Sequence, residues 1–162
     1  MDKEEVAQVS ALLQAAIVST RTLAKSLVPM ALKDAGIAGG LRELADYAEV
    51  MHGLAVELAL EDFPLPAEKA IQLYRIAREA VTNACKHSGT KNVRIEMRAD
   101  EGELTLAVRD FGSGLKEGSH DGLGLKIMEY RAAILGAHLE VFRHPEGGHC
   151  GRVSPSRLAE GI

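Results

Sequence analysis

The segment Glu79–His87, with the sequence EAVTNACKH, decides the fold, and it ends a long helical pattern over residues 67–87. Glu79, Asn83 and His87 follow one another at intervals of four residues, which places them in one narrow stripe of the helix. Asparagine is a poor helix former, yet Asn83 lies inside the pattern, and its amide oxygen suits Mg²⁺ as a hard ligand. The stripe therefore indicates either a metal-binding face or an ordinary solvated surface.

Two glycine-containing segments follow this helix along the chain. Asp110–Gly114, with the sequence DFGSG, comes directly after an alternating stretch that predicts a strand. Its glycines let the backbone leave the sheet and pass close to a ligand, and an Asp at the strand end can accept a hydrogen bond from an exocyclic amine. Gly122–Leu125, with the sequence GLGL, opens a predicted helix, whose free N–H groups attract phosphate. Each segment alone also fits an ordinary turn.

Hydrophobic periodicity and breaker residues predict the remaining elements. Helices are expected over residues 3–28, 41–51, 67–87 and 125–135, and strands over 56–60, 92–98, 103–109, 138–142 and 152–154. A connector with three glycines covers residues 35–40. This order of elements predicts an α+β sandwich, with helices on one face of a mostly antiparallel sheet.

The first helical pattern contains neither Gly nor Pro between residues 3 and 28. Its inward positions recur at alternating steps of three and four residues: Val6, Val9, Leu13, Ala16, Thr20, Leu23 and Leu27. Such a heptad seam needs a partner helix. The seam favours a helix bundle shared with another chain or with a segment outside this one. Docking of the helix on its own domain is the alternative.

The composition excludes several classes of protein. The chain has 162 residues, of which 46% are hydrophobic and 26% are charged, as in an ordinary globular domain. Its formal net charge of -4 argues against nucleic acid or an anionic membrane as the main partner. No apolar run approaches the roughly 18 residues of a membrane span, so no direct membrane contact is expected in this segment. Cys85 and Cys150 form no disulfide framework, which makes the cytoplasm the expected compartment.

The order and spacing of the three segments resemble the GHKL, or Bergerat, ATP-binding fold, a two-layer α/β sandwich. Arg78–Ser88 is similar to the N-box of sensor histidine kinases of the NarL/UhpB type, which pair with response regulators of the LuxR class. Gly122–Ala132, with the sequence GLGLKIMEYRA, is similar to the G-x-G-L-x-x-M-x-x-R-A pattern of that branch. Leu23–Pro29, together with Leu32–Leu44, resembles the join between the dimerisation bundle and the catalytic domain of that class.

The resemblance implies a protein-histidine kinase with ATP and Mg²⁺ as cofactors. Asn83 would bind Mg²⁺, and Glu79 would orient the water network of the metal. Lys86 and His87 would face the phosphates, and Asp110 would bind the adenine amino group. The implied nucleotide-binding residues are Asn83, His87, Asp110, Gly112, Gly114, Leu115, Gly122, Leu123, Gly124 and Leu125. The implied partners are a LuxR-class response regulator and a second copy of the chain, joined through the N-terminal helix.

The resemblance also divides the chain. Residues 1–29 would be the second helix of the dimerisation bundle, 30–52 a connector and first helix, and 53–162 the catalytic domain. No histidine lies in the first helix, so the phosphoacceptor is expected on a helix upstream of this chain. His120 precedes an acidic residue but falls in the glycine-rich lid, which is a poor position for the acceptor. Gly147–Gly151, with the sequence GGHCG, stands where the family carries Gly-Gly-x-Gly-Thr, which removes a threonine beside the nucleotide.

Two other functions fit parts of the pattern. A GHKL ATPase would hydrolyse ATP with Glu79 as the general base for water. A degenerate nucleotide-binding module would bind without catalysis, and the unusual Gly147–Gly151 segment favours it mildly. A zinc site from His138, His144, His149 and Cys150 follows no familiar ligand spacing, so scattered surface residues are the better interpretation.

Overall fold

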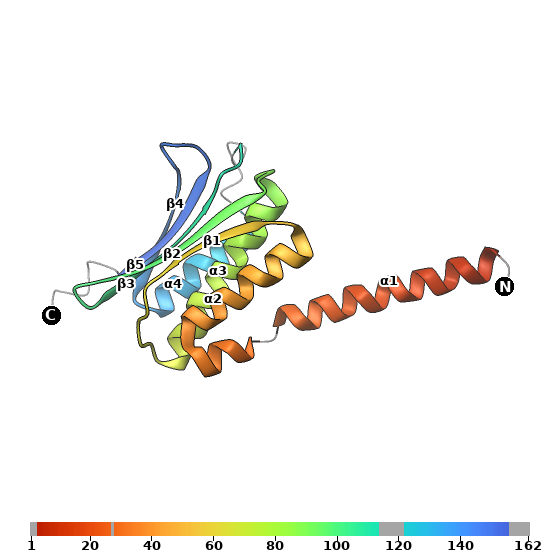
Figure 1. Cartoon of the computed structure of the whole chain (residues 1–162), viewed down its shortest axis with the longest axis horizontal. Helices are drawn as coiled ribbons and strands as arrows, with labels where there is room; N and C mark the ends of the chain where they lie inside the picture. The colour runs from red at the N-terminus through yellow and green to blue at the C-terminus, as the bar shows by residue number, and fades with distance from the viewer. Residues whose placement is uncertain (1–2, 27, 114–121, 156–162) are drawn as a thin grey trace.

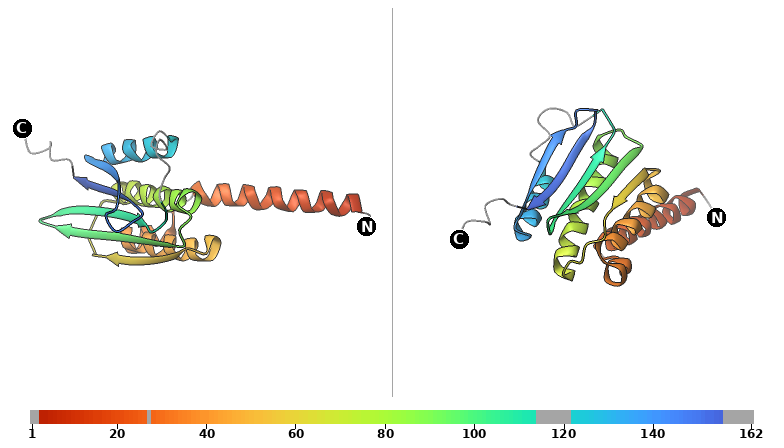
Figure 2. Two further views of the ribbon diagram at one scale, coloured as in Figure 1. Left: turned by 90° about the horizontal axis from the view of Figure 1, so that it is seen from above. Right: turned by 60° about the vertical axis from the view of Figure 1, so that its left-hand side comes forward.

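The computed structural model describes residues 3–26, 28–113 and 122–155, which form two layers and a projecting helix (Figure 1). The elements are α1 (Lys3–Ser26), α2 (Met30–His52), β1 (Ala55–Leu60), α3 (Ala67–His87), β2 (Asn92–Asp100), β3 (Glu103–Asp110), α4 (Leu123–Ile134), β4 (Ala137–Arg143) and β5 (His149–Pro155). Helices α2, α3 and α4 cover one face of the sheet (Figure 2). The predicted α+β sandwich is confirmed.

The sheet has the strand order β1-β2-β3-β5-β4. Strand β1 pairs parallel to β2, with Val56 beside Val93, and the other neighbours are antiparallel, so the sheet is mostly antiparallel as predicted. The last strand was expected over 152–154 only, and this prediction was too short. Strand β5 runs His149–Pro155 and bonds to strands on both sides, which extends it through His149, Cys150 and Gly151, a stretch without hydrophobic alternation.

Helix α2 begins earlier than the sequence indicates. The expected connector over 35–40 is helical except at Ala35 and Gly36, where φ/ψ of -125°/18° and 64°/-162° break the helix. A side chain at Gly39 would meet the carbonyl oxygen of Ala31 at 2.7 Å, so glycine lets the two parts of α2 pack closely. The prediction of a non-helical connector was therefore wrong beyond Gly36.

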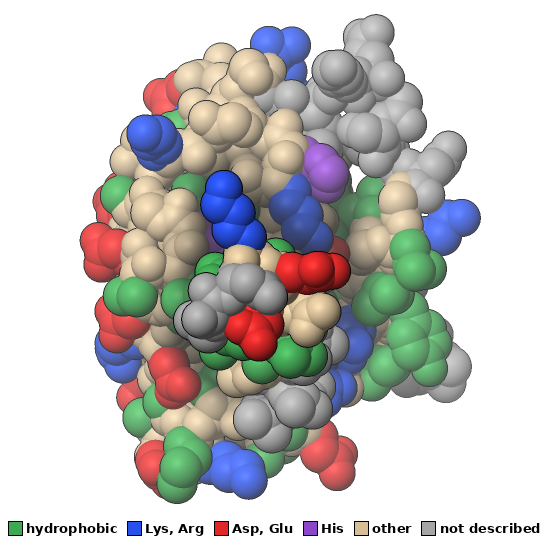
Figure 3. All heavy atoms as spheres, turned by 90° about the vertical axis from the view of Figure 1, so that its right-hand side faces the viewer, with side chains coloured by type: hydrophobic (Ala, Val, Ile, Leu, Met, Phe, Trp, Pro, Cys, Tyr) green, Lys and Arg blue, Asp and Glu red, His purple; other side chains and the backbone are tan. Residues whose placement is uncertain are grey.

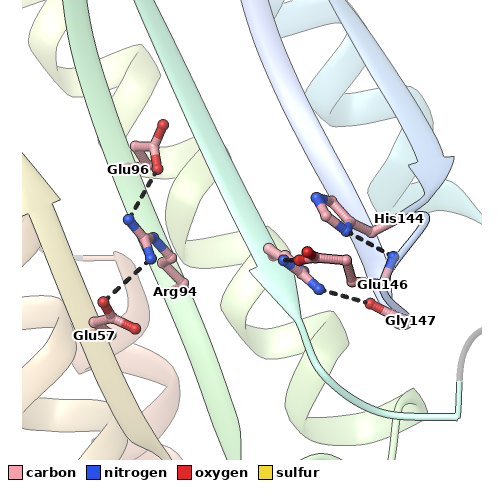
Figure 4. Close-up of polar contacts among 7 residues, drawn as sticks. Glu57, Arg94, Glu96, His144, Glu146 and Gly147 are labelled. Carbon is pink, nitrogen blue, oxygen red and sulfur yellow. Dashed lines mark hydrogen bonds and ion pairs between the residues drawn. The ribbon is translucent and has the colours of Figure 1, made fainter.

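The two faces of the sheet differ in polarity. Val93, Ile95 and Met97 of β2 point toward the helices and are at most 1% exposed. The alternate residues of β2 lie on the other face, where the guanidinium of Arg94 pairs with Glu57 at 3.2 Å and Glu96 at 3.3 Å (Figure 4). The core therefore lies between the sheet and its helices, and it forms one wall of the site described below.

Helix α1 extends away from the sandwich (Figure 1). Along its seam, Val6 and Val9 are 48% exposed and Leu13 is 60% exposed, so these side chains are not packed on their own domain. Leu27 and the side chain of Leu23 lie outside the described part of the structure. Across the described residues, no helix combines the length and apolar character needed to traverse a bilayer.

The end from which α1 projects has a mixed surface (Figure 3). Positive and negative side chains are interspersed there, and apolar side chains gather along one edge. On helix α4, Leu123 and Tyr130 are 74% and 69% exposed.

Candidate functional site

A cavity of about 380 Å³ lies between the second half of α3, the start of α4 and the strands β3, β4 and β5. Its lining joins the three segments singled out in the sequence: Glu79, Ala80, Asn83, Ala84, His87, Ser88, Val108, Asp110, Gly122, Leu123, Gly124, Leu125, Met128, Val141, His149 and Gly151. A volume of this size is typical of a small-molecule site. The structure therefore brings residues more than 70 positions apart into one concave surface.

Helix α3 presents the polar stripe to this cavity. Glu79, Asn83 and His87 all line it, as expected for side chains one turn apart on one helix face. Lys86 is exposed and is not among the lining residues. Contact of the Lys86 side chain with a ligand therefore remains a prediction. Gly114 and Leu115, both expected at the nucleotide, lie outside the described residues.

Asp110 is a buried acid at the end of β3, with 8% of its surface exposed. Its Oδ1 accepts hydrogen bonds from the backbone N–H of Gly112 at 3.0 Å and of His149 at 3.3 Å. Buried carboxylates need such partners, and both bonds go to one oxygen. The carboxylate is thus held in one orientation at the cavity wall.

Gly112 packs directly against the end of α3. A side chain there would overlap the carbonyl oxygen of Ser88, which also accepts a hydrogen bond of 3.2 Å from the backbone N–H of Ser113. Ser88 itself is buried, and its Oγ donates to the carbonyl of Ala84 at 2.6 Å. The sequence assigned no role to Ser88, although it ends the recognised helix motif. Its backbone carbonyl joins α3 to the loop that follows Asp110.

The turn between β4 and β5 closes the cavity beside Asp110. Gly148 has φ of 80°, and a side chain there would overlap the carbonyl oxygen of Asp110. His149 follows and lines the cavity, which the sequence reasoning missed when it grouped this residue with scattered surface positions. Its backbone bond to Asp110 depends on a strand pairing that spacing in the sequence does not reveal.

Arg109 braces this turn from the other face of the sheet. Its guanidinium donates to Oε2 of Glu146 and to the carbonyl of Gly147, each at 3.2 Å (Figure 4). The guanidinium carbon also lies 4.4 Å from the centre of the Phe111 ring, which is cation–π geometry. Arg109 therefore fixes the loop after β3 and the β4–β5 turn relative to each other.

The start of α4 lies against Glu79 at the cavity wall. Gly122 is the N-cap residue, and its carbonyl accepts from the N–H of Leu125 at 3.1 Å and of Lys126 at 3.3 Å. A side chain at Gly124 would overlap Oε1 of Glu79, so only glycine fits there without displacing that carboxylate. The N–H groups of the first turn of such a helix favour anions.

The remaining wall is apolar. Val108 and Met128 are 5% exposed, and they line the cavity together with Val141 and Gly151. The sequence reasoning missed Val108, Met128 and Val141 as site residues, because strand alternation and helix periodicity mark them only as core. An apolar wall beside one buried acceptor suits a flat heteroaromatic ring. In the described residues, His, Cys, Asp and Glu side chains form no cluster of three or more suited to a metal.

Residues 68–157 match the family model described as histidine kinase-, DNA gyrase B-, and HSP90-like ATPase. The chain belongs to this ATPase family. The matched range runs from α3 to β5 and includes every segment that lines the cavity. The domain is therefore a GHKL ATP-binding domain of the kind found in histidine kinases.

Similar proteins are sensor kinases. Sensor protein VraS of Staphylococcus epidermidis is 31% identical over 130 residues, which are 79% of this chain and 37% of VraS. The chain thus spans little more than a third of the length of this relative. The ATP-binding domain of PrrB from Mycobacterium tuberculosis is 25% identical, with a TM-score of 0.58, over 72% of this chain and 93% of PrrB's. The histidine kinase AdeS of Acinetobacter baumannii shares the fold, with a TM-score of 0.65 at 16% identity over 96% of this chain and 86% of AdeS's.

Proposed function

We propose that this ATPase-family domain binds Mg-ATP in the cavity and transfers the γ-phosphoryl group to a histidine on a helix outside this chain. The observation that carries the proposal is that one cavity is lined by two chemically different sets of residues. A buried carboxylate on an apolar wall forms one set, and an acid, an amide and an imidazole, together with a helix N-terminus, form the other. Mg-ATP has two matching parts, a flat base and charged phosphates.

The base end suits adenine. The carboxylate of Asp110 accepts hydrogen bonds and donates none, so it pairs with the exocyclic amine of adenine and opposes the carbonyl of guanine. Val108, Met128 and Val141 supply apolar surface for the ring. The backbone bonds to Oδ1 of Asp110 hold the carboxylate, so that its orientation needs no change when the base binds.

The phosphate end suits a metal-bound triphosphate. Asn83 would hold Mg²⁺ through its amide oxygen, with Glu79 positioned to orient metal-bound water. The first turn of α4 would bind phosphate oxygens through the backbone N–H groups of Leu123 and Gly124, because that of Leu125 donates to the carbonyl of Gly122. His87 would contact the phosphates from α3. When bound, Mg²⁺ supplies neutralisation of the charge on the phosphates.

The exposed seam of α1 supports the wider assignment. We assign residues 1–29 to the second helix of a dimerisation bundle, 30–52 to the connector and first helix, and 53–162 to the catalytic domain. Homodimerisation would bury Val6, Val9 and Leu13, which are about half exposed or more in the single chain. The motif pattern further favours the NarL/UhpB type, a LuxR-class response regulator as the recipient of the phosphoryl group, and a cytoplasmic location.

Replacement of Asn83 tests the site. Asn83→Ala should weaken Mg-ATP binding by at least about tenfold in calorimetry, because an amide ligand to the cation is lost. The melting temperature without nucleotide should stay within a few degrees of the unmodified chain. Asn92→Ala is the matched control, since Asn92 is exposed at the start of β2 and does not line the cavity. Unchanged Mg-ATP affinity in Asn83→Ala would contradict the assignment.

A labelling experiment distinguishes phosphotransfer from the alternative of ATP hydrolysis with Glu79 as general base. Within the described residues, the histidines lie on the sandwich and none lies on α1. Incubated with γ-labelled ATP, this chain should bind nucleotide, turn it over slowly at most, and form no acid-labile phosphohistidine. Addition of a bundle fragment with an acceptor histidine should restore labelling on the fragment. Fast hydrolysis that Glu79→Gln abolishes would instead favour the ATPase.

A further inference from the structure

Gly151 leaves a gap in the apolar wall of the cavity. It lies on β5 between Val108 of β3 and Val141 of β4, on the face that packs against the helices. A methyl group built at Gly151 would have no neighbouring atom within 4 Å. A central strand of the sheet therefore lacks a side chain at a position where its two neighbours both supply one.

Gly151 also lines a smaller hollow of about 20 Å³. It shares Ala80, Val108, Met128, Val141 and Gly151 with the wall of the main cavity, so the two spaces are neighbours. Every residue that lines the hollow is apolar or glycine. Water in such a space would find no polar partner, whereas a volume of this size holds about one methyl-sized group.

Asp110 lines the main cavity together with Val108 and Gly151, and these last two residues also line the hollow. Val108 precedes Asp110 by two residues on β3, so both side chains are on the same face of the strand. An exocyclic amine that binds Asp110 uses one N–H. Its second hydrogen is therefore the position from which a substituent can reach toward Val108 and Gly151.

We propose that Gly151 opens the base end of the cavity into an apolar recess that admits adenine nucleotides with a small alkyl group on the exocyclic amine. The proposal rests on adenine nucleotides as the ligand. A secondary amine keeps one N–H for Asp110 and places its alkyl group in the recess. A threonine at this position would fill the gap and add a hydroxyl group, so it would exclude the substituent. Gly151 is thus a specificity-determining residue.

The test compares the affinities of ATP and N6-methyl-ATP, each with Mg²⁺, by calorimetry. The unmodified chain should bind N6-methyl-ATP as well as ATP or up to about fourfold more tightly, because the methyl group leaves water for an apolar site. Gly151→Thr should lower the affinity for N6-methyl-ATP relative to ATP by at least about tenfold. Gly151→Ala adds a smaller side chain, so its ratio of N6-methyl-ATP affinity to ATP affinity should lie between those of the unmodified chain and Gly151→Thr. If Gly151→Thr does not fold, the comparison of Gly151→Ala with the unmodified chain still tests the proposal.

Ala107→Thr is the matched control. Ala107 neighbours Arg152 on the face of the sheet opposite to the cavity, so its replacement adds the same group and should leave the ratio unchanged. The recess proposal is overturned where the unmodified chain binds ATP but rejects N6-methyl-ATP, or where the glycine replacements leave the ratio unaltered. Failure of both nucleotides to bind the unmodified chain would overturn the proposed function together with the recess.

Discussion

The backbone N–H of His149 donates a hydrogen bond of 3.3 Å to Oδ1 of Asp110. The bond joins the start of β5 to the end of β3 at the wall of the cavity, between residues that lie 39 positions apart in the chain. The bond fixes the acceptor that we assign to adenine with a main-chain group. No side chain at position 149 is needed for this contact. The identity of residue 149 can therefore vary without loss of the bond, whereas the geometry of the preceding turn cannot.

The base preference follows from the acceptor character of Asp110. ATP should bind at least about tenfold more tightly than GTP, because a buried acceptor left without a donor costs about 1–3 kcal/mol. Asp110→Asn supplies a donor and should narrow this difference. Competition binding with ATP and GTP measures the ratio of the two affinities. Asp100→Asn, at an exposed position, is the control and should leave this ratio unchanged. Equal affinities of the unmodified chain for ATP and GTP would contradict the assignment of Asp110 to the adenine amine.

Arg109→Lys should weaken nucleotide binding several-fold although Arg109 does not line the cavity. A lysine cannot bond Glu146 and the carbonyl of Gly147 in a fork and also stack on Phe111. The variant should lose about 1 kcal/mol of stability, measured by urea unfolding. Arg98→Lys, at an exposed ion pair on the same face, should change neither quantity. A nucleotide affinity as high as that of the control would show that the brace does not act on the site.

Replacement of two neighbouring glycines distinguishes the cost of backbone strain from the cost of a steric clash. Gly147 and Gly148 both have positive φ, of 96° and 80°, but only a side chain at Gly148 would overlap the carbonyl of Asp110. Gly147→Ala should cost about 1–2 kcal/mol in unfolding free energy, for backbone strain alone. Gly148→Ala should cost clearly more and should also weaken ATP binding. Similar losses in the two variants would mean that the close contact is unimportant.

Cys150 gives a pH dependence of stability. Burial raises the pKa of its thiol above the ordinary value of 9.0. The folded chain then keeps the proton at a pH where the unfolded chain loses it, so this contribution to stability is present below 9.0 and is lost as the pH rises further. Between pH 8 and pH 10, roughly the range around a free thiol's pKa, the melting temperature should fall more in the unmodified chain than in Cys150→Ala. Burial also raises the pKa of Tyr74, but that effect is common to both chains and cancels. Parallel curves would contradict the prediction.

Leu13 and Leu12 provide a matched pair on α1. Leu13 lies on the heptad seam and Leu12 beside it, and they are 60% and 71% exposed. Leu13→Glu should convert a dimer to a monomer in light scattering and leave the melting temperature of the sandwich unchanged. Leu12→Glu should leave the dimer intact. If the two variants behave alike, the seam does not form the interface.

The sequence was most informative where periodicity and chemistry coincided. The interval of four residues from Glu79 to His87 predicted both a helix and a shared face, and all three side chains of that stripe line the cavity. The mostly antiparallel sheet followed from alternation in β2 and β3. These signals are local, and the physical rules behind them need no knowledge of distant contacts.

The errors came from long-range packing. Strand β5 is set by pairing with β3 and β4 through a stretch that contains Gly151, which has little strand propensity. Gly39 lies where a side chain would meet the carbonyl oxygen of Ala31, in the other part of α2. His149 reaches the site only because β5 lies beside the end of β3. No spacing rule along the chain could reveal these three relationships.

The close approach of Gly124 to Glu79 ties the first turn of α4 to the carboxylate on α3. A side chain at position 124 would displace Oε1 of Glu79, the residue that we assign to metal-bound water. A replacement on α4 would therefore change the phosphate end of the cavity through a residue of α3.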